Sequence, residues 1–485
     1  MFQGRKICFQ ELNLSVNRFA NGLKELGVKQ GSRVGLYLSN CPEFIISHFA
    51  TLKLGAISVP INPMYKGREI EYIILNSGVH TIIIDKNVYP HFLEVKSSLS
   101  NLKNVIATSD QPRLDTISFH EILTKNSPDQ PNVEIRDEDL AVIGYTSGTT
   151  GRSKGATITH RNYISNIATL TEIWRWTSQD RLLVSLPLFH QHGLGIMLHG
   201  TVYTGSSMVL MERFNATKAL QFIEKYACTV FMGVPTTYVR FLEVKDHQKF
   251  DFSTVRVFIS GSAPLPTQVF NRFKEKYGFT ILERYGMTET AVVNTSNPYD
   301  VERKPGKVGL PIPGVQVRIV NECGKNLALG QVGEIVVKGP NVMKGYWNMP
   351  EETAEAFRDG WLITGDLGKF DEDGYLTIVG RKKEMIITSG FKVYPREVEE
   401  VLASHPKVEE TAVVGVPDPV RGEAVEAFVV LRHKEKATEL EIVGYCKDKM
   451  AIFKVPRTVK FLQSLPRTES GKIIKSALIK KDSFK

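Results

Sequence analysis

The strongest constraint on the fold of this chain is a repeated alternation of amphipathic helical patterns with short apolar runs. Residues 9–27 place apolar side chains at three- and four-residue spacing and end at Gly27, as an amphipathic helix does at its C-terminus. The pattern is followed by the β-branched run RVGLYLS, and the alternation recurs in VHTIIID, AVIGYTS and RVFISG. Alternating helices and buried strands are typical of layered α/β folds. We therefore expect an α/β protein with largely parallel sheets.

The pattern changes near Val308, where short strands and turns replace the alternation. A compact α/β pattern resumes after a charged turn at residues 381–384. We expect a large N-terminal domain over residues 1–382, built of layered α/β subdomains plus a β-subdomain, and a small α/β C-terminal domain over residues 383–485. The chain has 485 residues, of which 42% are hydrophobic, and this length and composition exclude a single small module and a disordered chain.

Most of the excess positive charge lies near the C-terminus. The formal net charge is +9, and residues 454–485 carry nine Lys or Arg and two Asp or Glu, which accounts for +7 of it. This tail lacks interleaved aromatic residues, so we expect small anions as partners and no nucleic acid. Five scattered cysteines favour a reducing compartment, and no run approaches the roughly 20 apolar residues of a spanning helix. We expect a cytoplasmic protein without an integral membrane segment, and the sequence leaves its oligomeric state open.

A loop rich in hydroxyl residues and glycine follows the apolar run AVIG. It reads YTSGTTGRSKG, from Tyr145 to Gly155. Backbone N–H groups of such a loop close around phosphate oxygens, and its lysine adds a mobile positive charge. The loop is not a Walker A motif, because Ser153 stands where the second glycine belongs and Gly155 where Ser or Thr belongs. A flexible surface loop is the alternative interpretation.

Four more segments accompany this loop in a fixed order. They are GSAPLP at 261–266, ERYGMTET at 283–290, GWLITGDLG at 360–368 with Gly380-Arg381, and LPRTESGK at 465–472. Together the five resemble the adenylate-forming acyl-CoA synthetase superfamily, from the first helix to within about ten residues of the C-terminus. Two features depart from it: most members carry Pro where Ser153 stands, and relatives usually have several tens of residues before the equivalent of residues 9–13, so that Met1 looks like a late start.

The resemblance implies a two-step reaction and a set of roles. A carboxylate attacks the α-phosphate of ATP and pyrophosphate leaves, and the thiol of CoA then displaces AMP from the acyl-adenylate. The implied phosphate-binding residues are Thr146, Ser147, Gly148, Thr149, Thr150 and Lys154. The adenine and ribose residues are Gly261, Ser262, Ala263, Tyr285, Asp366 and Arg381. Thr288 contacts the α-phosphate, Glu289 holds Mg²⁺ through a carboxylate as this hard cation prefers, and Lys472 is the adenylation lysine.

Relatives rotate a mobile C-terminal domain between the two steps, because the lysine of the first step blocks the thiol of the second. The hinge residue that matches by alignment is Lys383, although a solvated residue in the RKKE run is the alternative. After rotation the stretch from Thr388 to Lys392 faces the site, and Gly390 and Lys392 are the implied CoA contacts. A glycine lets the thin pantetheine arm pass close to the backbone.

The acyl substrate is indicated by fewer residues. His190 matches the residue that gates the acyl pocket, and His192 is a second candidate. Arg284 stands where many synthetases for apolar acids have glycine, and a guanidinium there is suited to a second carboxylate on the substrate. Arg240 is a second arginine candidate. An ion pair of Arg284 with Glu283 or another acid is the structural alternative.

These residues favour an AMP-forming acid–CoA ligase for a small dicarboxylate such as malonate or methylmalonate, with ATP, Mg²⁺ and CoA. Several segments around the acyl pocket resemble malonyl-CoA synthetases, whereas segments outside it resemble bacterial fatty acyl-CoA ligases equally well. A medium- or long-chain fatty acyl-CoA ligase is therefore the alternative. A carrier-protein adenylation enzyme is less favoured, because no carrier domain follows Lys485. A lysyl-AMP nucleotidyl transferase would need a K-x-D-G motif, which the sequence lacks.

Overall fold

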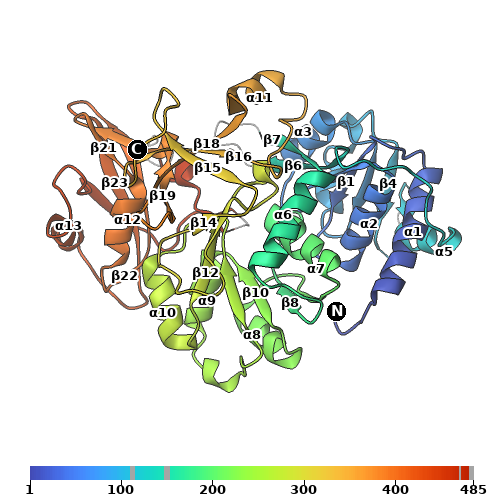
Figure 1. Ribbon diagram of the computed structural model, residues 1–485, viewed down its shortest axis with the longest axis horizontal. Helices are drawn as coiled ribbons and strands as arrows, with labels where there is room; N and C mark the ends of the chain where they lie inside the picture. The colour runs from blue at the N-terminus through green and yellow to red at the C-terminus, as the bar shows by residue number, and fades with distance from the viewer. Residues whose placement is uncertain (110–114, 147–152, 469–470, 480–485) are drawn as a thin grey trace.

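The computed structural model describes residues 1–109, 115–146, 153–468 and 471–479 (Figure 1). Its first sheet has the strand order β5-β4-β3-β1-β2-β6-β7, parallel up to β6 and antiparallel between β6 and β7. The strands are β1 (Arg33–Tyr37), β2 (Ile57–Pro60), β3 (Thr81–Ile84), β4 (Asn104–Ala107), β5 (Ile117–Ser118), β6 (Leu140–Thr146) and β7 (Lys154–Thr159). All residues of β2 and β3 are buried, which explains their continuous apolar runs.

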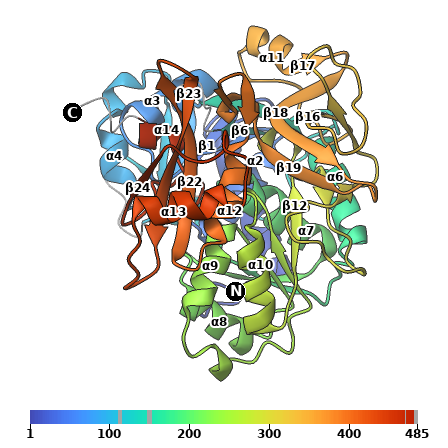
Figure 2. The ribbon, with the colours of Figure 1, turned by 90° about the vertical axis from the view of Figure 1, so that its left-hand side faces the viewer.

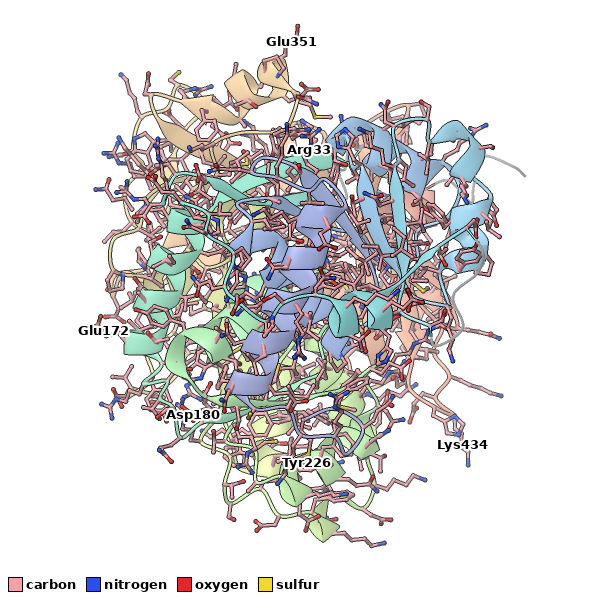
Figure 3. The ribbon with its side chains drawn as sticks, turned by 90° about the vertical axis from the view of Figure 1, so that its right-hand side faces the viewer. Arg33, Glu172, Asp180, Tyr226, Glu351 and Lys434 are labelled. Carbon is pink, nitrogen blue, oxygen red and sulfur yellow. The ribbon has the colours of Figure 1, made fainter. Side chains whose placement is uncertain are left out.

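Helices accompany this sheet as the alternation predicts. They are α1 (Phe9–Glu25), α2 (Pro42–Lys53), α3 (Arg68–Ser77), α4 (Tyr89–Leu93), η1 (Lys96–Ser98) and α5 (Phe119–Lys125). The predicted first helix is confirmed: α1 buries Phe19 and Leu23, and Gly27 follows it with φ +86°, a left-handed conformation that glycine adopts readily. Figure 3 shows α1 and α2 side by side over the sheet.

The second sheet has the order β14-β13-β12-β11-β10-β8-β9 and is parallel from β9 to β12. Its strands are β8 (Arg181–Val184), β9 (Ser207–Leu210), β10 (Val230–Gly233), β11 (Val257–Ser260), β12 (Ile281–Tyr285), β13 (Thr295–Ser296) and β14 (Leu310–Pro311). The helical segments around it are α6 (His160–Ile173), the π-helical η2 (His192–Leu198), α7 (His199–Thr204), α8 (Ala216–Lys225), α9 (Pro235–Glu243), η3 (His247–Lys249), α10 (Thr267–Tyr277) and η4 (Thr288–Thr290). The carboxyl ends of β11 and β12 lead directly into the GSAPLP and ERYGMTET segments, where parallel sheets place their binding sites.

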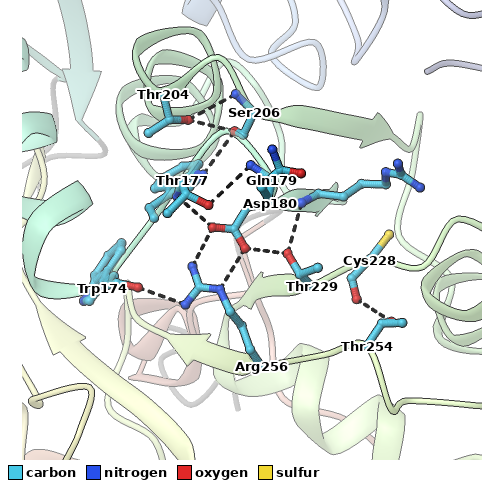
Figure 4. Close-up of polar contacts among 12 residues, drawn as sticks. Trp174, Thr177, Gln179, Asp180, Thr204, Ser206, Cys228, Thr229, Thr254 and Arg256 are labelled. Atoms are coloured by element: carbon cyan, nitrogen blue, oxygen red, sulfur yellow. Dashed lines mark hydrogen bonds and ion pairs between the residues drawn. The ribbon is translucent and has the colours of Figure 1, made fainter.

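An ion pair between the buried Asp180 and the half-buried Arg256 lies at the opposite, amino end of this sheet (Figure 4). Arg256, just before β11, donates from Nε and Nη2 to the two carboxylate oxygens of Asp180 at 2.7 and 2.8 Å. Thr229, just before β10, donates to Asp180 at 2.6 Å. Burial disfavours the Asp180 carboxylate, but these hydrogen bonds outweigh burial and lower its pKa. The cluster therefore links three strand starts and leaves Asp180 fully partnered.

The predicted β-subdomain is an antiparallel sheet in the order β15-β16-β18-β17, with β19 added to β18. The elements are β15 (Gln316–Val320), β16 (Gly333–Lys338), α11 (Pro350–Ala356), β17 (Phe357–Arg358), β18 (Trp361–Phe370), β19 (Leu376–Arg381) and the 3₁₀ turn η5 (Lys382–Glu384). The register of β18 and β19 sets Asp366 opposite Arg381. Two residues predicted to hold ribose are thereby neighbours.

The last sheet has the order β21-β20-β23-β22, with β24 paired to β23. The elements are β20 (Ile386–Thr388), β21 (Phe391–Val393), α12 (Pro395–Ala403), β22 (Val408–Asp418), β23 (Gly422–Leu431), α13 (Glu439–Lys447), β24 (Thr458–Phe461) and α14 (Lys475–Ile479). This sheet has its own core, with Val398, Val413 and Val425 buried. Figures 1 and 2 show α12 next to α10 of the second sheet. The predicted α/β class with layered sheets and a separate C-terminal domain is confirmed.

Candidate active site

Asp366 lies at the centre of a group of predicted nucleotide-binding residues. Its Oδ2 accepts a hydrogen bond from the Tyr285 hydroxyl at 2.7 Å, and its Oδ1 is 2.7 Å from Arg381 Nε. Asp366 is only 5% exposed, and burial raises its pKa despite the opposing charge of Arg381. Tyr285 ends β12, so this contact joins the second sheet to the β-subdomain. The carboxylate keeps lone pairs for further donors, as a ribose-binding acid needs.

Glu289, the predicted Mg²⁺ ligand, lies in η4, one residue after Thr288. It is 7% exposed, and its Oε1 accepts a hydrogen bond from the Tyr346 hydroxyl at 3.0 Å. Burial raises the pKa of Glu289, while the Tyr346 hydrogen bond and the charges of Arg381 and Lys472 lower it. One buried carboxylate beside a threonine hydroxyl fits a Mg²⁺ ion that takes its other ligands from phosphate and water. In the described residues no group of three or more potential metal-binding side chains occurs.

Tyr346 was missed by the sequence reasoning. It follows β16 in the turn KGYWN, which carries no recognised chemical motif. Besides Glu289, it contacts Lys154, whose Nζ lies 5.1 Å from the centre of the Tyr346 ring. Lys154 begins β7 and pairs in register with Thr146, the last residue of β6. Tyr346 therefore brings the predicted phosphate lysine and the predicted metal ligand to one place.

Part of the phosphate loop lies outside the described residues, namely Ser147, Gly148, Thr149 and Thr150. The two strands that lead into and out of the loop are described, and both are held from α3. Tyr72 donates a hydrogen bond to the carbonyl of Ser153 at 2.9 Å, and Tyr145 donates to Asn76 Oδ1 at 2.6 Å. The stem of the loop is thus fixed where the family usually has proline.

Lys472, the predicted adenylation lysine, faces the same group of residues. Burial and the positive charge of Arg381 lower its pKa, whereas Asp366 and Glu289 act in the opposite direction. Gly471 precedes it with φ +81°, and a Cβ on Gly471 would lie 2.5 Å from Thr236 Oγ1 of α9. The C-terminal segment therefore packs directly on the N-terminal part of the chain.

His190 and His192 flank the start of the π-helical segment η2. Burial and the nearby Lys472 lower the pKa of His190 to about 4. His192 is 3% exposed, and its Nδ1 lies 3.2 Å from Ser262 Oγ. Burial and then Arg284 lower the pKa of His192, and its Nε2 is buried without a hydrogen-bond partner among the described residues. Both imidazoles are therefore neutral at physiological pH.

Arg284 is 2% exposed and lies beside His192. Its Nε and Nη2 are buried and have no hydrogen-bond partner in the described part of the chain. Burial lowers its pKa to about 9. The alternative partner, Glu283, is also buried, but it accepts a hydrogen bond from the backbone N–H of Leu265 instead. Gly261, predicted to line adenine, lies under the Arg284 guanidinium, because a Cβ there would come within 2.4 Å of Cζ.

The prediction that Arg240 lines the acyl pocket is wrong. The side chain of Arg240 is 66% exposed near the end of α9 and lies 3.1 Å from Glu243. The FMGVPTTYVR segment does reach the site, through Thr236 rather than through Arg240. The helical spacing explains the error. Thr236 and Arg240 are four residues apart on α9 and so lie near one face of the helix, but Thr236 is partly covered whereas Arg240 is exposed.

The predicted hinge and CoA residues are all exposed. Lys383 is exposed in η5, between β19 of the β-subdomain and β20 of the C-terminal sheet. Gly390 is exposed in the turn between β20 and β21 with φ +81°. Lys392 is on β21, and its Nζ is 3.8 Å from Glu322 Oε1.

Ser262 and Ala263, predicted to line adenine, directly follow Gly261, and Ser262 has φ +70°.

Two family models match the chain: the AMP-binding enzyme over residues 1–347 and the AMP-binding enzyme C-terminal domain over residues 397–472. A long-chain-fatty-acid–CoA ligase of Bacillus subtilis (strain 168) is 35% identical, over 99% of this chain and 91% of its own length. ATP-bound MatB from Rhodopseudomonas palustris is 39% identical, over 100% of this chain and 96% of its own, with a TM-score of 0.93. The apo form of MatB gives a TM-score of 0.81 at 38% identity and the same coverage.

No helix in the described ranges is both long and apolar enough to cross a membrane. The family matches span both the N-terminal sheets and the C-terminal sheet. The curated relatives cover nearly the whole chain and are named as CoA ligases. The chain belongs to the AMP-binding enzyme family and is an AMP-forming acyl-CoA synthetase.

Proposed function

We propose that this synthetase activates a small dicarboxylic acid, such as malonate or methylmalonate, and transfers the acyl group to CoA. The proposal rests on the burial of Arg284. This residue is 2% exposed, and its Nε and Nη2 have no hydrogen-bond partner among the described residues. A buried arginine without a counter-ion is costly, and an apolar acyl chain would leave that cost in place. A second carboxylate on the substrate removes it through charge-assisted hydrogen bonds.

His192 supports the same substrate class. When the Ser262 hydroxyl donates to Nδ1 of the neutral ring, the ring proton is on Nε2, which then is a donor. This Nε2 is buried and has no partner in the described ranges, like the guanidinium nitrogens of Arg284 beside it. The unpartnered N–H groups of His192 and Arg284 therefore match the two oxygens of one carboxylate. His190, facing Lys472, lies on the side where the reacting carboxylate approaches.

The rest of the site then serves the chemistry on ATP. Asp366 accepts ribose hydroxyls, Tyr285 covers adenine, and Thr288 contacts the α-phosphate. Glu289 would hold a Mg²⁺ ion, which would neutralise charge on the phosphates. Lys472 bridges the attacking carboxylate and the α-phosphate, where negative charge gathers in the transition state. The closer fit to ATP-bound than to apo MatB supports this placement of the C-terminal domain for the adenylation step.

We propose domains at residues 1–382 and 383–485, with Lys383 as the hinge. The sheets change between Arg381 and Ile386, which supports a boundary here. Rotation about Lys383 withdraws Lys472 and brings Gly390 and Lys392 toward CoA. A hinge residue absorbs dihedral changes and needs no chemistry of its own, which suits an exposed lysine in a short turn.

A medium- or long-chain fatty acid is the second candidate, because the Bacillus subtilis relative is named for that class. A panel of acids from C2 to C16, with malonate and methylmalonate, separates the two candidates when Mg·ATP and CoA are supplied. We expect malonate or methylmalonate to give the highest kcat/KM. Efficient turnover of octanoate with none of malonate would overturn the dicarboxylate proposal.

Two arginine variants form a matched pair for the same panel. Arg284→Met removes the buried guanidinium and keeps an apolar side chain of similar length, and we expect kcat/KM for malonate to fall about 100-fold. Arg240→Met removes the exposed guanidinium and should leave kcat/KM within about twofold. Equal losses in both variants would show that Arg284 contributes no more to substrate binding than a surface charge.

The role of Lys472 is tested by separating the half-reactions. Lys472→Ala should abolish acid-dependent ATP–pyrophosphate exchange yet retain thioester formation from a supplied acyl-adenylate and CoA. The physical reason is that the rotated domain no longer presents Lys472 during the second step. Equal loss of both half-reactions would contradict the alternating-domain account.

A further inference from the structure

Lys475 lies three residues after Lys472, and its ammonium group forms ion pairs inside the protein. It begins α14, and its Nζ lies 2.8 Å from Glu399 Oε1 and 3.4 Å from Glu384 Oε2. Its side chain is 19% exposed, and both carboxylates are also largely covered. One ammonium group thus joins two acids from different elements, α12 and η5.

Lys475 and Lys472 differ in their electrostatic surroundings. Burial disfavours the charged form of both. At Lys475 the charges of Glu399 and Glu384 outweigh burial and raise the pKa. At Lys472 burial and the charge of Arg381 lower the pKa. Lys475 is therefore committed to internal ion pairs, while Lys472 faces the substrate side.

Both carboxylates that hold Lys475 lie in the proposed C-terminal domain. Glu399 Oε1 also accepts a hydrogen bond from the backbone N–H of Val413 at 2.8 Å, which fixes it to β22. Glu384 is the last residue of η5 and directly follows Lys383, the proposed hinge. The ion pairs of Lys475 therefore reach from the segment of the adenylation lysine to the hinge and to the C-terminal sheet.

Only Ile473 and Ile474 separate the two lysines, and backbone hydrogen bonds hold this part of the chain. The backbone N–H of Thr468 donates to the carbonyl of Lys472 at 2.7 Å, and that of Ile474 donates to Pro466 at 2.8 Å. Leu478 of α14 is 2% exposed and holds the helix on the C-terminal core. A displacement of Lys475 is therefore transmitted to Lys472 with little chain to absorb it.

We propose that Lys475 is a positioning residue for adenylation. Through Glu384 and Glu399 it makes the Lys472 segment move as one body with the hinge, so that domain rotation and delivery of the Lys472 ammonium are a single motion. This inference rests on the proposed roles of Lys472 and Lys383, and it does not depend on which acid is activated. It predicts a defect in the adenylation step alone, because Lys472 is withdrawn during thioester formation.

Lys475→Met tests the proposal in the full-length enzyme. We expect the maximal rate of ATP–pyrophosphate exchange to fall about 10- to 100-fold, with the KM for ATP within about twofold of wild type. Thioester formation from supplied acyl-adenylate and CoA should be unchanged. Lys475→Arg keeps the charge and should recover most of the exchange rate. The acid is whichever one the wild type activates best, so failure of the dicarboxylate proposal leaves this test intact.

Lys454→Met is the matched control, because Lys454 also pairs with α12, at 2.7 Å from Glu397, and has no contact with Lys472 among the described residues. It should leave both half-reactions near wild type. Glu384→Gln weakens the same contact without removing the lysine and gives a second variant should Lys475→Met fold poorly; it should slow exchange about threefold to tenfold. Equal slowing of both half-reactions in these variants, or an exchange rate within twofold of wild type, overturns the proposal.

Discussion

The guanidinium of Arg284 lies against Gly261, so that a Cβ on Gly261 would come within 2.4 Å of both Cζ and Nε. Gly261→Ala must therefore shift the guanidinium away from its position beside His192. We expect kcat/KM for malonate to fall about 10- to 100-fold, since a shift of about 1 Å in a binding group has an effect of this size. Steady-state kinetics with malonate and ATP measure the change.

The control for Gly261 is the same substitution in an Arg284→Met background. The flexible methionine yields to a new Cβ, so Gly261→Ala should then cost less than about threefold. An equal loss in both backgrounds, or a loss confined to the KM for ATP, would mean that Gly261 acts through adenine alone.

Asp366→Asn is expected to weaken nucleotide binding. The carboxylate accepts from Tyr285 and Arg381 at once, and an amide directs an N–H at one of these donors. We expect the Kd for AMP, measured by calorimetry, to rise about 10- to 100-fold. Asp371→Asn, in the turn between β18 and β19 and paired with Lys307, is the matched control and should bind AMP like the wild type.

The sequence predicts the fold class because amphipathic helical patterns alternate with apolar runs, and its motifs name residues that the structure brings together. Tyr285 and Asp366 are far apart in the chain and belong to β12 and β18 of different sheets, and the 2.7 Å contact between them depends on how these two sheets pack. Arg240 and Tyr346 were not predicted correctly. Whether an arginine on an amphipathic helix is buried depends on packing by another domain, and Tyr346 acts through a contact with Glu289 that no local pattern encodes.

Glu283 should make stability depend on pH near neutrality. Burial raises its pKa from 4.5 to about 7, since it is 2% exposed and its Oε2 has no partner in the described ranges. The folded state then binds a proton that the unfolded state releases. Stability from this group is full below pH 4.5 and is lost as pH rises toward 7, by up to about 3 kcal/mol.

Glu283→Gln removes this titration while its amide oxygen still accepts from Leu265. We expect the variant to gain stability relative to wild type between pH 5 and pH 8, measured as the urea midpoint at each pH. Glu275→Gln, exposed on α10, should keep the pH dependence of the wild type. A constant difference between Glu283→Gln and wild type across this range would show that Glu283 has an ordinary pKa.

The end of the second sheet away from the site depends on the ion pair of Asp180 and Arg256 for its stability. Arg256→Met leaves the Asp180 carboxylate, 4% exposed, with Thr229 but without its counter-ion. Removing one partner of a buried ion pair destabilises a protein by about 3–5 kcal/mol. Asp180→Asn in the same chain removes the stranded charge and should recover part of this loss, because the cost comes from the unpaired carboxylate. Urea unfolding of the three variants measures the recovery, and the KM for ATP should stay unchanged, since the cluster lies at the amino ends of strands whose carboxyl ends form the site. The three variants are Arg256→Met, Asp180→Asn and the double variant. A double variant that loses more free energy of unfolding than the two single variants lose together would contradict this account of the cluster.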